Sequence, residues 1–176
     1  ASFLNRIGLT PNAVTLTGLF GNFIGALFLA RGSFFVGGVI LLLMGPMDAL
    51  DGAMARLRSE SSKFGALVDS VSDRYSELII FAGLLYYYLQ HSDWFWAVLV
   101  FFAASGSYMV SYVRARAEGL GYHAKGGLLT RAERFIVLVP SIIFQYPEVG
   151  IAIIALLANV TALHRVFIVR KQAHPH

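Results

Sequence analysis

Apolar runs close to membrane-spanning length recur along this chain, and they limit its fold more than any other feature. Hydrophobic residues make up 57% of the 176 residues and charged residues only 14%. A membrane-spanning helix needs about 20 mostly apolar residues, and its backbone groups must bond to one another because the bilayer core holds no water. The pattern predicts an all-α, polytopic membrane protein, with a single domain over residues 1–176.

Polar breaks divide the chain into six expected transmembrane helices. These cover residues 13–30, 34–47 with a polar extension to 58, 64–90, 94–118, 131–146 and 148–170. Thr10-Pro11-Asn12 is a helix-start signal before the first of them. Within that helix, Gly18, Gly21 and Gly25 recur at three- and four-residue intervals, which favours close packing against a neighbouring helix.

The distribution of basic residues predicts the orientation of these helices. With six spans, the turns near 31–33, 91–93 and 146–148 share one side, where only Arg31 of the fourteen Lys and Arg residues lies. Arg74 falls within the third helix, and the other twelve lie on or lean toward the opposite side. Basic residues concentrate on the cytosolic side of membrane proteins. We therefore expect a multi-pass cell-membrane protein with both termini in the cytosol.

Residues 47–77 stand out because six carboxylates fall among almost wholly apolar neighbours. Asp48 and Asp51 are three apart, and Asp69 and Asp73 are four apart, so each pair shares one face of a helix. The first pair ends one expected helix and the second begins the next, so the pairs can face each other across a hairpin. Without cations these carboxylates would repel one another. Together they suit Mg²⁺ or Mn²⁺, and two such ions could hold a diphosphate.

The neighbours of these aspartates fit the same chemistry. Gly52 leaves room for a ligand at the backbone, and Arg56 can meet phosphate oxygens in a forked geometry. Glu60 and Glu77 complete the six carboxylates but have no part in this pattern. In the plainest alternative, the four aspartates are salt-bridged to Arg56, Arg74 and other arginines at a membrane surface.

Other classes of protein fit the sequence less well. A divalent-cation or proton-coupled transporter would need ionisable groups across the bilayer, whereas these groups concentrate on one side. A structural membrane subunit that binds a metal is a further alternative. The chain has no cysteine, which excludes a disulfide framework, a zinc–thiolate site and a thiol nucleophile. The sequence has no cluster of basic residues interleaved with aromatic residues, which is the pattern that would indicate nucleic-acid binding.

The spacing Asp48-x2-Asp51-Gly52-x2-Ala55-Arg56-x8-Gly65-x3-Asp69-x3-Asp73 resembles the signature of the CDP-alcohol phosphatidyltransferase family at every fixed position. The six-span layout agrees with that family over essentially the whole chain. The resemblance implies a cytosol-facing polar cavity in which an acceptor hydroxyl attacks the β-phosphorus of a CDP-linked lipid and CMP is released. It also implies that the four aspartates hold the metal ions, that Asp73 is the general base, and that the protein forms a homodimer.

The same resemblance implies a set of residues that bind the CDP group. These include Gly52, Arg56 and Gly65 of the signature. The run 10–15 resembles the start of the family's first helix, where Pro11, Asn12 and Thr15 would lie beside the nucleotide; an ordinary helix cap is the alternative. Ser62 falls where members often carry a small hydroxyl residue, although it could be an ordinary turn serine. The expected donor is CDP-diacylglycerol, or a CDP-linked ether lipid of archaeal type.

A second cluster, of basic residues, bears on the acceptor. Arg114, Arg134 and Arg165 come from three expected helices and lean to the cytosolic side, where they could form a pocket for a phosphate group. The alternative is that these residues only follow the topology, with side chains that reach the membrane surface. That alternative is the preferred interpretation for Arg116, Arg170 and Lys171.

The acceptor is predicted from a narrower resemblance. The run 111–118, Gly126-Gly127 and the run 131–134 resemble the phosphatidylinositol-phosphate synthase branch of the family, whose acceptor is inositol phosphate. Ser111, Arg114, Arg134 and Arg165 match the acceptor-binding positions of that branch. Arg114 departs from it, because the branch commonly has lysine there, and the donor geometry of the two side chains differs. Glycerol 3-phosphate is the alternative acceptor.

Overall fold

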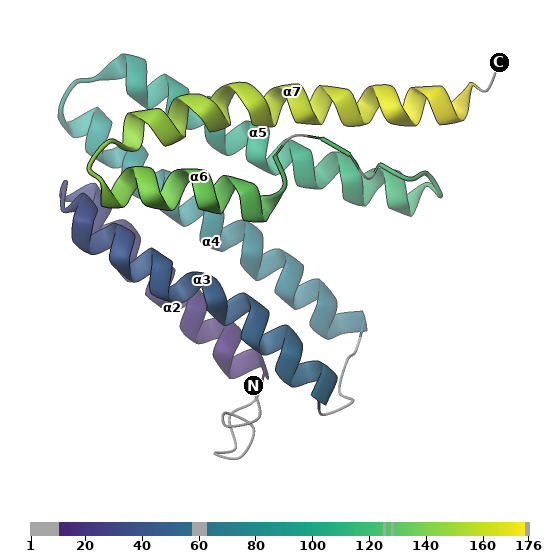
Figure 1. Ribbon diagram of the computed structural model, residues 1–176, viewed down its shortest axis with the longest axis horizontal. Coiled ribbons are helices and arrows are strands. Elements are labelled where there is room, and N and C mark those ends of the chain that lie inside the picture. Colours follow the sequence, from purple (N-terminus) through teal and green to yellow (C-terminus); the bar gives the residue numbers. More distant parts are fainter. Residues whose placement is uncertain (1–10, 58–62, 125, 128, 175–176) are drawn as a thin grey trace. The chain divides into compact units, whose positions relative to one another are not determined.

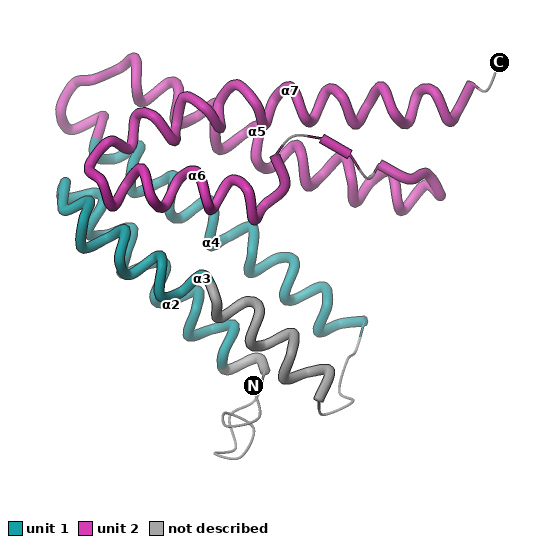
Figure 2. The backbone as a smooth tube through the Cα atoms, in the orientation of Figure 1, with its two compact units in different colours: residues 1–87 teal, residues 88–176 magenta. Residues whose placement is uncertain are grey.

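The structure, a computed structural model, describes residues 11–57, 63–124, 126–127 and 129–174, with the backbone alone at 11–13 and 46–57. Over these residues it contains six α-helices and no strand, which confirms the all-α prediction (Figure 1). The helices are α2 (Pro11–Ala30), α3 (Phe34–Leu57), α4 (Lys63–Gln90), α5 (Trp94–Gly119), α6 (Arg131–Ile143) and α7 (Pro147–Ala173). The chain divides into two compact units, Ala1–Tyr87 and Tyr88–His176 (Figure 2).

The same turn ends four of these helices. Each contains one residue with a positive φ angle: Gly32 (76°), Ser92 (55°), Gly121 (82°) and Gln145 (66°). In the first turn, Gly32 N donates to the carbonyl oxygen of Leu29 at 2.9 Å, and Ser33 N donates to that of Phe28 at 2.9 Å. The other three turns repeat this pair of bonds. These Schellman motifs bind the last helical carbonyls, which would otherwise lack partners.

The end of α6 differs from the expectation. The helix ends at Ile143, whereas the sequence predicted a span that reaches residue 146. Gln145 takes the left-handed conformation usual for glycine, so nothing in the residue types announces this turn. Tyr146 precedes a proline, which disfavours helical geometry at residue 146, and α7 begins directly at Pro147.

Small residues let the helices of the first unit approach closely. A Cβ atom on Gly37 of α3 would lie 3.0 Å from the carbonyl oxygen of Gly25 on α2. On α4, a Cβ atom on Gly83 would lie only 2.5 Å from the carbonyl oxygen of Ala26. Gly21 and Gly25 of α2 likewise leave no room for a Cβ atom beside Met44 and Leu41 of α3, so the predicted close packing is confirmed at these two glycines.

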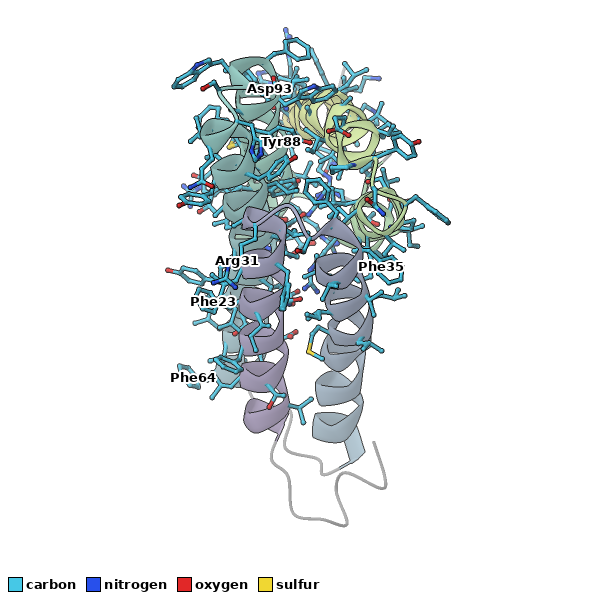
Figure 3. All side chains as sticks on the ribbon, turned by 90° about the vertical axis from the view of Figure 1, so that its left-hand side faces the viewer. Phe23, Arg31, Phe35, Phe64, Tyr88 and Asp93 are labelled. Carbon is cyan, nitrogen blue, oxygen red and sulfur yellow. The ribbon has the colours of Figure 1, made fainter. Side chains whose placement is uncertain are left out.

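Large apolar side chains cover much of the outer surface. Figure 3 shows Phe23, Phe35 and Phe64 pointing outward from α2, α3 and α4, and they are 46%, 56% and 71% exposed. Among the described helices, α5 and α7 are each long and apolar enough to cross a membrane, whereas the apolar parts of α2 and α3 are shorter (Val14–Ala30 and Phe34–Gly45). Such a surface suits contact with lipid.

In the second unit, α7 packs against both α5 and α6. Asn159 of α7 donates from Nδ2 to the carbonyl oxygen of Phe102 on α5 at 3.0 Å. Gly150 of α7 faces Leu138 and Ser141 of α6 with no room for a larger side chain. The buried Tyr88 donates its hydroxyl to Glu148 Oε1 at 2.8 Å and thereby ties the last turn of α4 to the first turn of α7.

Candidate functional site

The acidic part of the candidate site lies on α4, in the first unit. Gly65, Asp69 and Asp73 follow one another at four-residue intervals, so they occupy one face of this helix. Both aspartates are half-buried. The side chain of Asp73 is 16% exposed and pairs with Arg74, whose Nη2 lies 3.6 Å from Asp73 Oδ2. The helix thus presents two carboxylates, one turn apart, on a partly accessible face.

The partner aspartates lie on α3, where the structure describes the backbone alone. Asp48 and Asp51 are three apart on a continuous helix and therefore share a face, as the sequence predicted. The side chains of Asp48, Asp51, Gly52 and Arg56 lie outside the described atoms, as do those of Pro11 and Asn12 and all of Ser62. Thr15 is buried on α2.

A divalent ion would need more donors than α4 alone supplies. Among the side chains that the structure describes, no three acidic, histidine or cysteine residues gather in one place. The two α4 carboxylates are hard oxygen donors of the kind that Mg²⁺ and Mn²⁺ take. The donor set therefore fits such an ion where the Asp48–Asp51 pair completes it.

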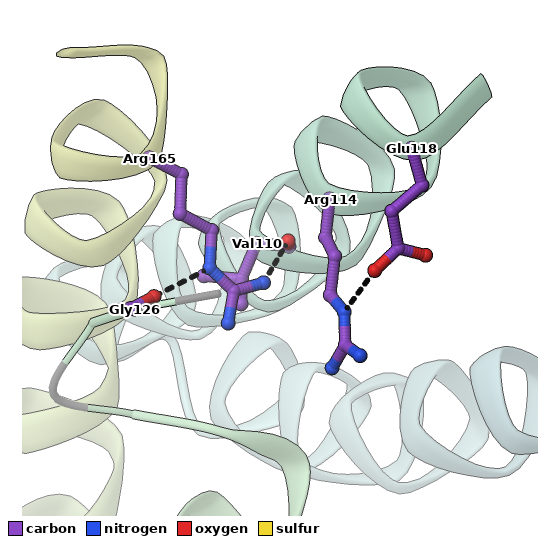
Figure 4. Close-up of polar contacts among 5 residues, drawn as sticks. All are labelled: Val110, Arg114, Glu118, Gly126 and Arg165. Carbon is purple, nitrogen blue, oxygen red and sulfur yellow. Dashed lines mark hydrogen bonds and ion pairs between the residues drawn. The ribbon is translucent and has the colours of Figure 1, made fainter. Parts of the chain in front are cut away.

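Arg165 is the central residue of the basic cluster, in the second unit. It is only 4% exposed. Its guanidinium donates from Nε to the carbonyl oxygen of Gly126 at 2.8 Å and from Nη1 to that of Val110 at 2.6 Å (Figure 4). Both of these partners are uncharged backbone carbonyls. Burying a charge is costly unless hydrogen bonds compensate, and these two fix the plane of the guanidinium.

Arg134 and Arg114 join Arg165 from the two neighbouring helices. Arg134, on α6, is 2% exposed and donates from Nη1 to the carbonyl oxygen of Leu129 at 3.3 Å. Arg114, on α5, is exposed and donates from Nε to Glu118 Oε1 at 3.0 Å. Figure 4 shows the guanidinium groups of Arg114 and Arg165 projecting into the same region. Ser111, half-buried on α5, donates to the carbonyl oxygen of Ser107 at 3.4 Å.

The three arginines gather around the connection between α5 and α6. Arg134 and Arg165 bind the carbonyl oxygens of Leu129 and Gly126, which both belong to that connection, and Arg114 projects toward the region of Arg165 (Figure 4). Guanidinium groups match the oxygens of a phosphate, so an anion would suit this cluster of positive charge. The structure thus brings together the three arginines that the sequence placed on three separate helices.

Two long-range polar contacts of α7 were not foreseen. Gln172, at the end of α7, pairs through its amide with the backbone of His123. Tyr88 and Glu148 pair at the opposite end of α7. Each contact joins residues at least 49 positions apart, so no local sequence signal marks it.

Comparison with known proteins gives one family. The sequence model of the CDP-alcohol phosphatidyltransferases matches residues 8–167. A protein of Mycobacteroides abscessus named phosphatidylinositol phosphate synthase is 36% identical over an alignment 183 positions long, which covers 97% of this chain and 81% of that protein.

Solved structures of a related enzyme have the same fold. The crystal structure of Mycobacterium tuberculosis phosphatidylinositol phosphate synthase (PgsA1) with CDP-DAG bound is similar at a TM-score of 0.89 and 31% identity, and it covers 96% of this chain and 90% of that one. The same enzyme in complex with manganese and citrate is similar at a TM-score of 0.90 and 32% identity, with 96% and 86% covered.

Proposed function

This chain belongs to the CDP-alcohol phosphatidyltransferase family, and we propose that it transfers a phosphatidyl group from CDP-diacylglycerol to inositol phosphate. The products are phosphatidylinositol phosphate and CMP. The chain is thus a phosphotransferase of phospholipid synthesis and a membrane protein. The observation that carries the choice of acceptor is the convergence of Arg114, Arg134 and Arg165 from three helices of one unit.

The reaction is a displacement at phosphorus. A hydroxyl oxygen of the acceptor forms a bond to the phosphorus that carries diacylglycerol, and the bond from that phosphorus to the bridging oxygen of the diphosphate breaks. The bridging oxygen leaves with CMP. Asp73 takes the proton of the attacking hydroxyl, a role that its half-buried position on an accessible face of α4 allows.

Asp48, Asp51, Asp69 and Asp73 are the proposed ligands of two divalent ions, either Mg²⁺ or Mn²⁺. Bound there, the ions would neutralise charge on the diphosphate. The α4 carboxylates support this assignment by their chemistry and spacing, and the manganese complex of the M. tuberculosis enzyme supports the use of a divalent metal. Arg74 pairs with Asp73 and helps to orient its carboxylate.

The CDP group is proposed to bind beside this acidic face. Gly65 lies one turn before Asp69 on the same face of α4 and leaves space there for the nucleotide. The further proposed contacts, which rest on the family signature and the start of α2, are Gly52, Arg56, Ser62, Pro11, Asn12 and Thr15.

The acceptor phosphate is proposed to bind among Ser111, Arg114, Arg134 and Arg165. The bonds that Arg165 makes to Gly126 and Val110 leave Nη2 without a hydrogen bond within the described part of the chain. An arginine carries five N–H groups, so the two backbone bonds do not exhaust its donors. Arg114 binds Glu118 through Nε, and this bond does not use the two terminal nitrogens of its guanidinium.

The proposed setting follows from the charge distribution. The basic residues in the last turns of α5 and α7 support an orientation in which the arginines face the cytosol, where CMP and inositol phosphate are soluble species. Both termini are proposed to lie on that side. Six transmembrane passes, a cavity open to the cytosol, a single domain and a homodimer complete the proposal.

One assay tests the proposed function. Purified protein with CDP-diacylglycerol and Mg²⁺ or Mn²⁺ is offered inositol phosphate, glycerol 3-phosphate, inositol or serine, and CMP is measured. We expect metal-dependent release with inositol phosphate and none without an acceptor. Release with glycerol 3-phosphate alone would overturn the choice of acceptor. If no CMP is released with any acceptor from either diacyl or ether donors, and the protein carries cations across vesicle membranes, the protein is a transporter and the proposed transferase function is wrong.

A further inference from the structure

The connection between α5 and α6 lies along one stripe of α7. Four α7 residues meet it, and their spacing of four, three and four positions places them on a single face of the helix. They are Thr161 against Gly127, Arg165 and Ile168 against Gly126, and Gln172 against His123. The connection therefore runs antiparallel to α7.

The attachments at His123 and Gly126 are only three positions apart in the sequence. A chain of that length spans at most about 11 Å. The position of His123 therefore limits where the carbonyl oxygen of Gly126 can lie.

Each end of the connection has its own attachment. Toward α6, Arg134 binds the carbonyl oxygen of the buried Leu129. Toward α5, His123 N donates to Gln172 Oε1 at 3.0 Å, and Gln172 Nε2 donates to the carbonyl oxygen of His123 at 2.6 Å. A primary amide carries a donor and an acceptor in one plane, so it satisfies both backbone groups of a single residue.

We propose that Gln172 is a positioning residue for the acceptor-phosphate site. By fixing His123, it sets the register of the connection on α7, and the Gly126 carbonyl then holds the guanidinium of Arg165. Gln172 lies two turns beyond Arg165, so it touches neither the acceptor nor the arginine. This inference rests on the proposed function, because it assigns Gln172 a role through the arginine that binds the acceptor.

Replacing Gln172 with alanine tests the inference. We expect the KM for inositol phosphate to rise by about threefold to tenfold, as for the loss of a hydrogen-bonded restraint. The KM for CDP-diacylglycerol and kcat should stay within about twofold of wild type, because α4 is untouched. Lys171→Ala, at the neighbouring exposed position of α7, is the matched control and should change none of the three values.

A second measurement follows the attachment itself. Hydrogen exchange of the backbone amides at 123–127 should become faster in Gln172→Ala and stay unchanged in Lys171→Ala. If the wild type is active and Gln172→Ala has the same acceptor KM, the positioning role of Gln172 is wrong and the proposed function stands. The same conclusion follows if kcat and both KM values of the variant worsen together. A wild type that releases no CMP with any phosphorylated acceptor overturns the proposed function, and the positioning role with it.

Discussion

Replacing Arg165 with lysine separates the charge of this residue from its geometry. The guanidinium binds two backbone carbonyls, those of Gly126 and Val110, which belong to different segments of the chain. Its remaining N–H groups are then available for a phosphate. A lysine ammonium keeps the charge, but its three N–H groups sit on one nitrogen and cannot reproduce this fork. The variant must give up either a carbonyl or the phosphate.

The magnitude follows from the bonds that are lost. A hydrogen bond from a charged donor contributes about 1.5–3 kcal/mol. Loss of one such bond corresponds to a factor of about 10 to 150 in binding. If the lysine binds the carbonyls, the loss raises the KM for inositol phosphate. If it binds the phosphate, the loss lowers the free energy of unfolding, because the carbonyl of Val110 or that of Gly126 loses the bond it receives from the guanidinium.

Two measurements on Arg165→Lys therefore belong together. CMP release is followed against acceptor concentration, and thermal unfolding is followed in detergent. Arg170→Lys is the matched control, since Arg170 is an exposed arginine five positions further along α7. A variant with an acceptor KM within about twofold of wild type and a Tm within about one degree would refute the structural reasoning, because neither loss would then have occurred.

The remaining predictions concern the base and two backbone positions. Asp73→Asn should lower CMP release by at least about a hundredfold while the circular-dichroism spectrum stays helical, since a general base is removed; wild-type turnover would contradict this role. Gln145→Gly should raise the free energy of unfolding by about 1 kcal/mol, because glycine adopts the positive φ angle without strain, and an unchanged thermal transition would argue against it. Gly83→Ala should lower that free energy by about 1–3 kcal/mol, since its methyl group would meet the Ala26 carbonyl oxygen, whereas Gly119→Ala, with open space around it, should not.

The helices could be predicted from the sequence because hydrophobic length and proline mark them locally. Pro11 and Pro147 begin helices, and Gly32 ends one, in keeping with the ordinary preferences of these residues. The end of α6 could not be predicted, because Gln145 takes a conformation that its residue type disfavours. Such a choice is set by the packing of α6 against α7, which single residues do not reveal.

The candidate site, too, could be predicted only in part. Spacing alone placed Asp69 and Asp73 on one face of α4, since a helix converts spacing into direction. Charge type alone suggested that Arg114, Arg134 and Arg165 serve an anion, but the carbonyls that hold Arg165 come from residues 39 and 55 positions away. The sequence gives no signal for Gln172, because its partner is the backbone of His123, 49 positions away.

In the proposed six-pass topology, the Schellman turns at Gly32, Ser92 and Gln145 are the turns that cross the membrane during insertion. During insertion, any backbone amide carried into hydrocarbon without a partner costs several kcal/mol. In each of these turns the N–H groups and the last helical carbonyls are already bonded within six consecutive residues. The tip of a nascent hairpin can therefore take its hydrogen bonds with it as it crosses, so little more than one short turn has to be translocated for each pair of helices.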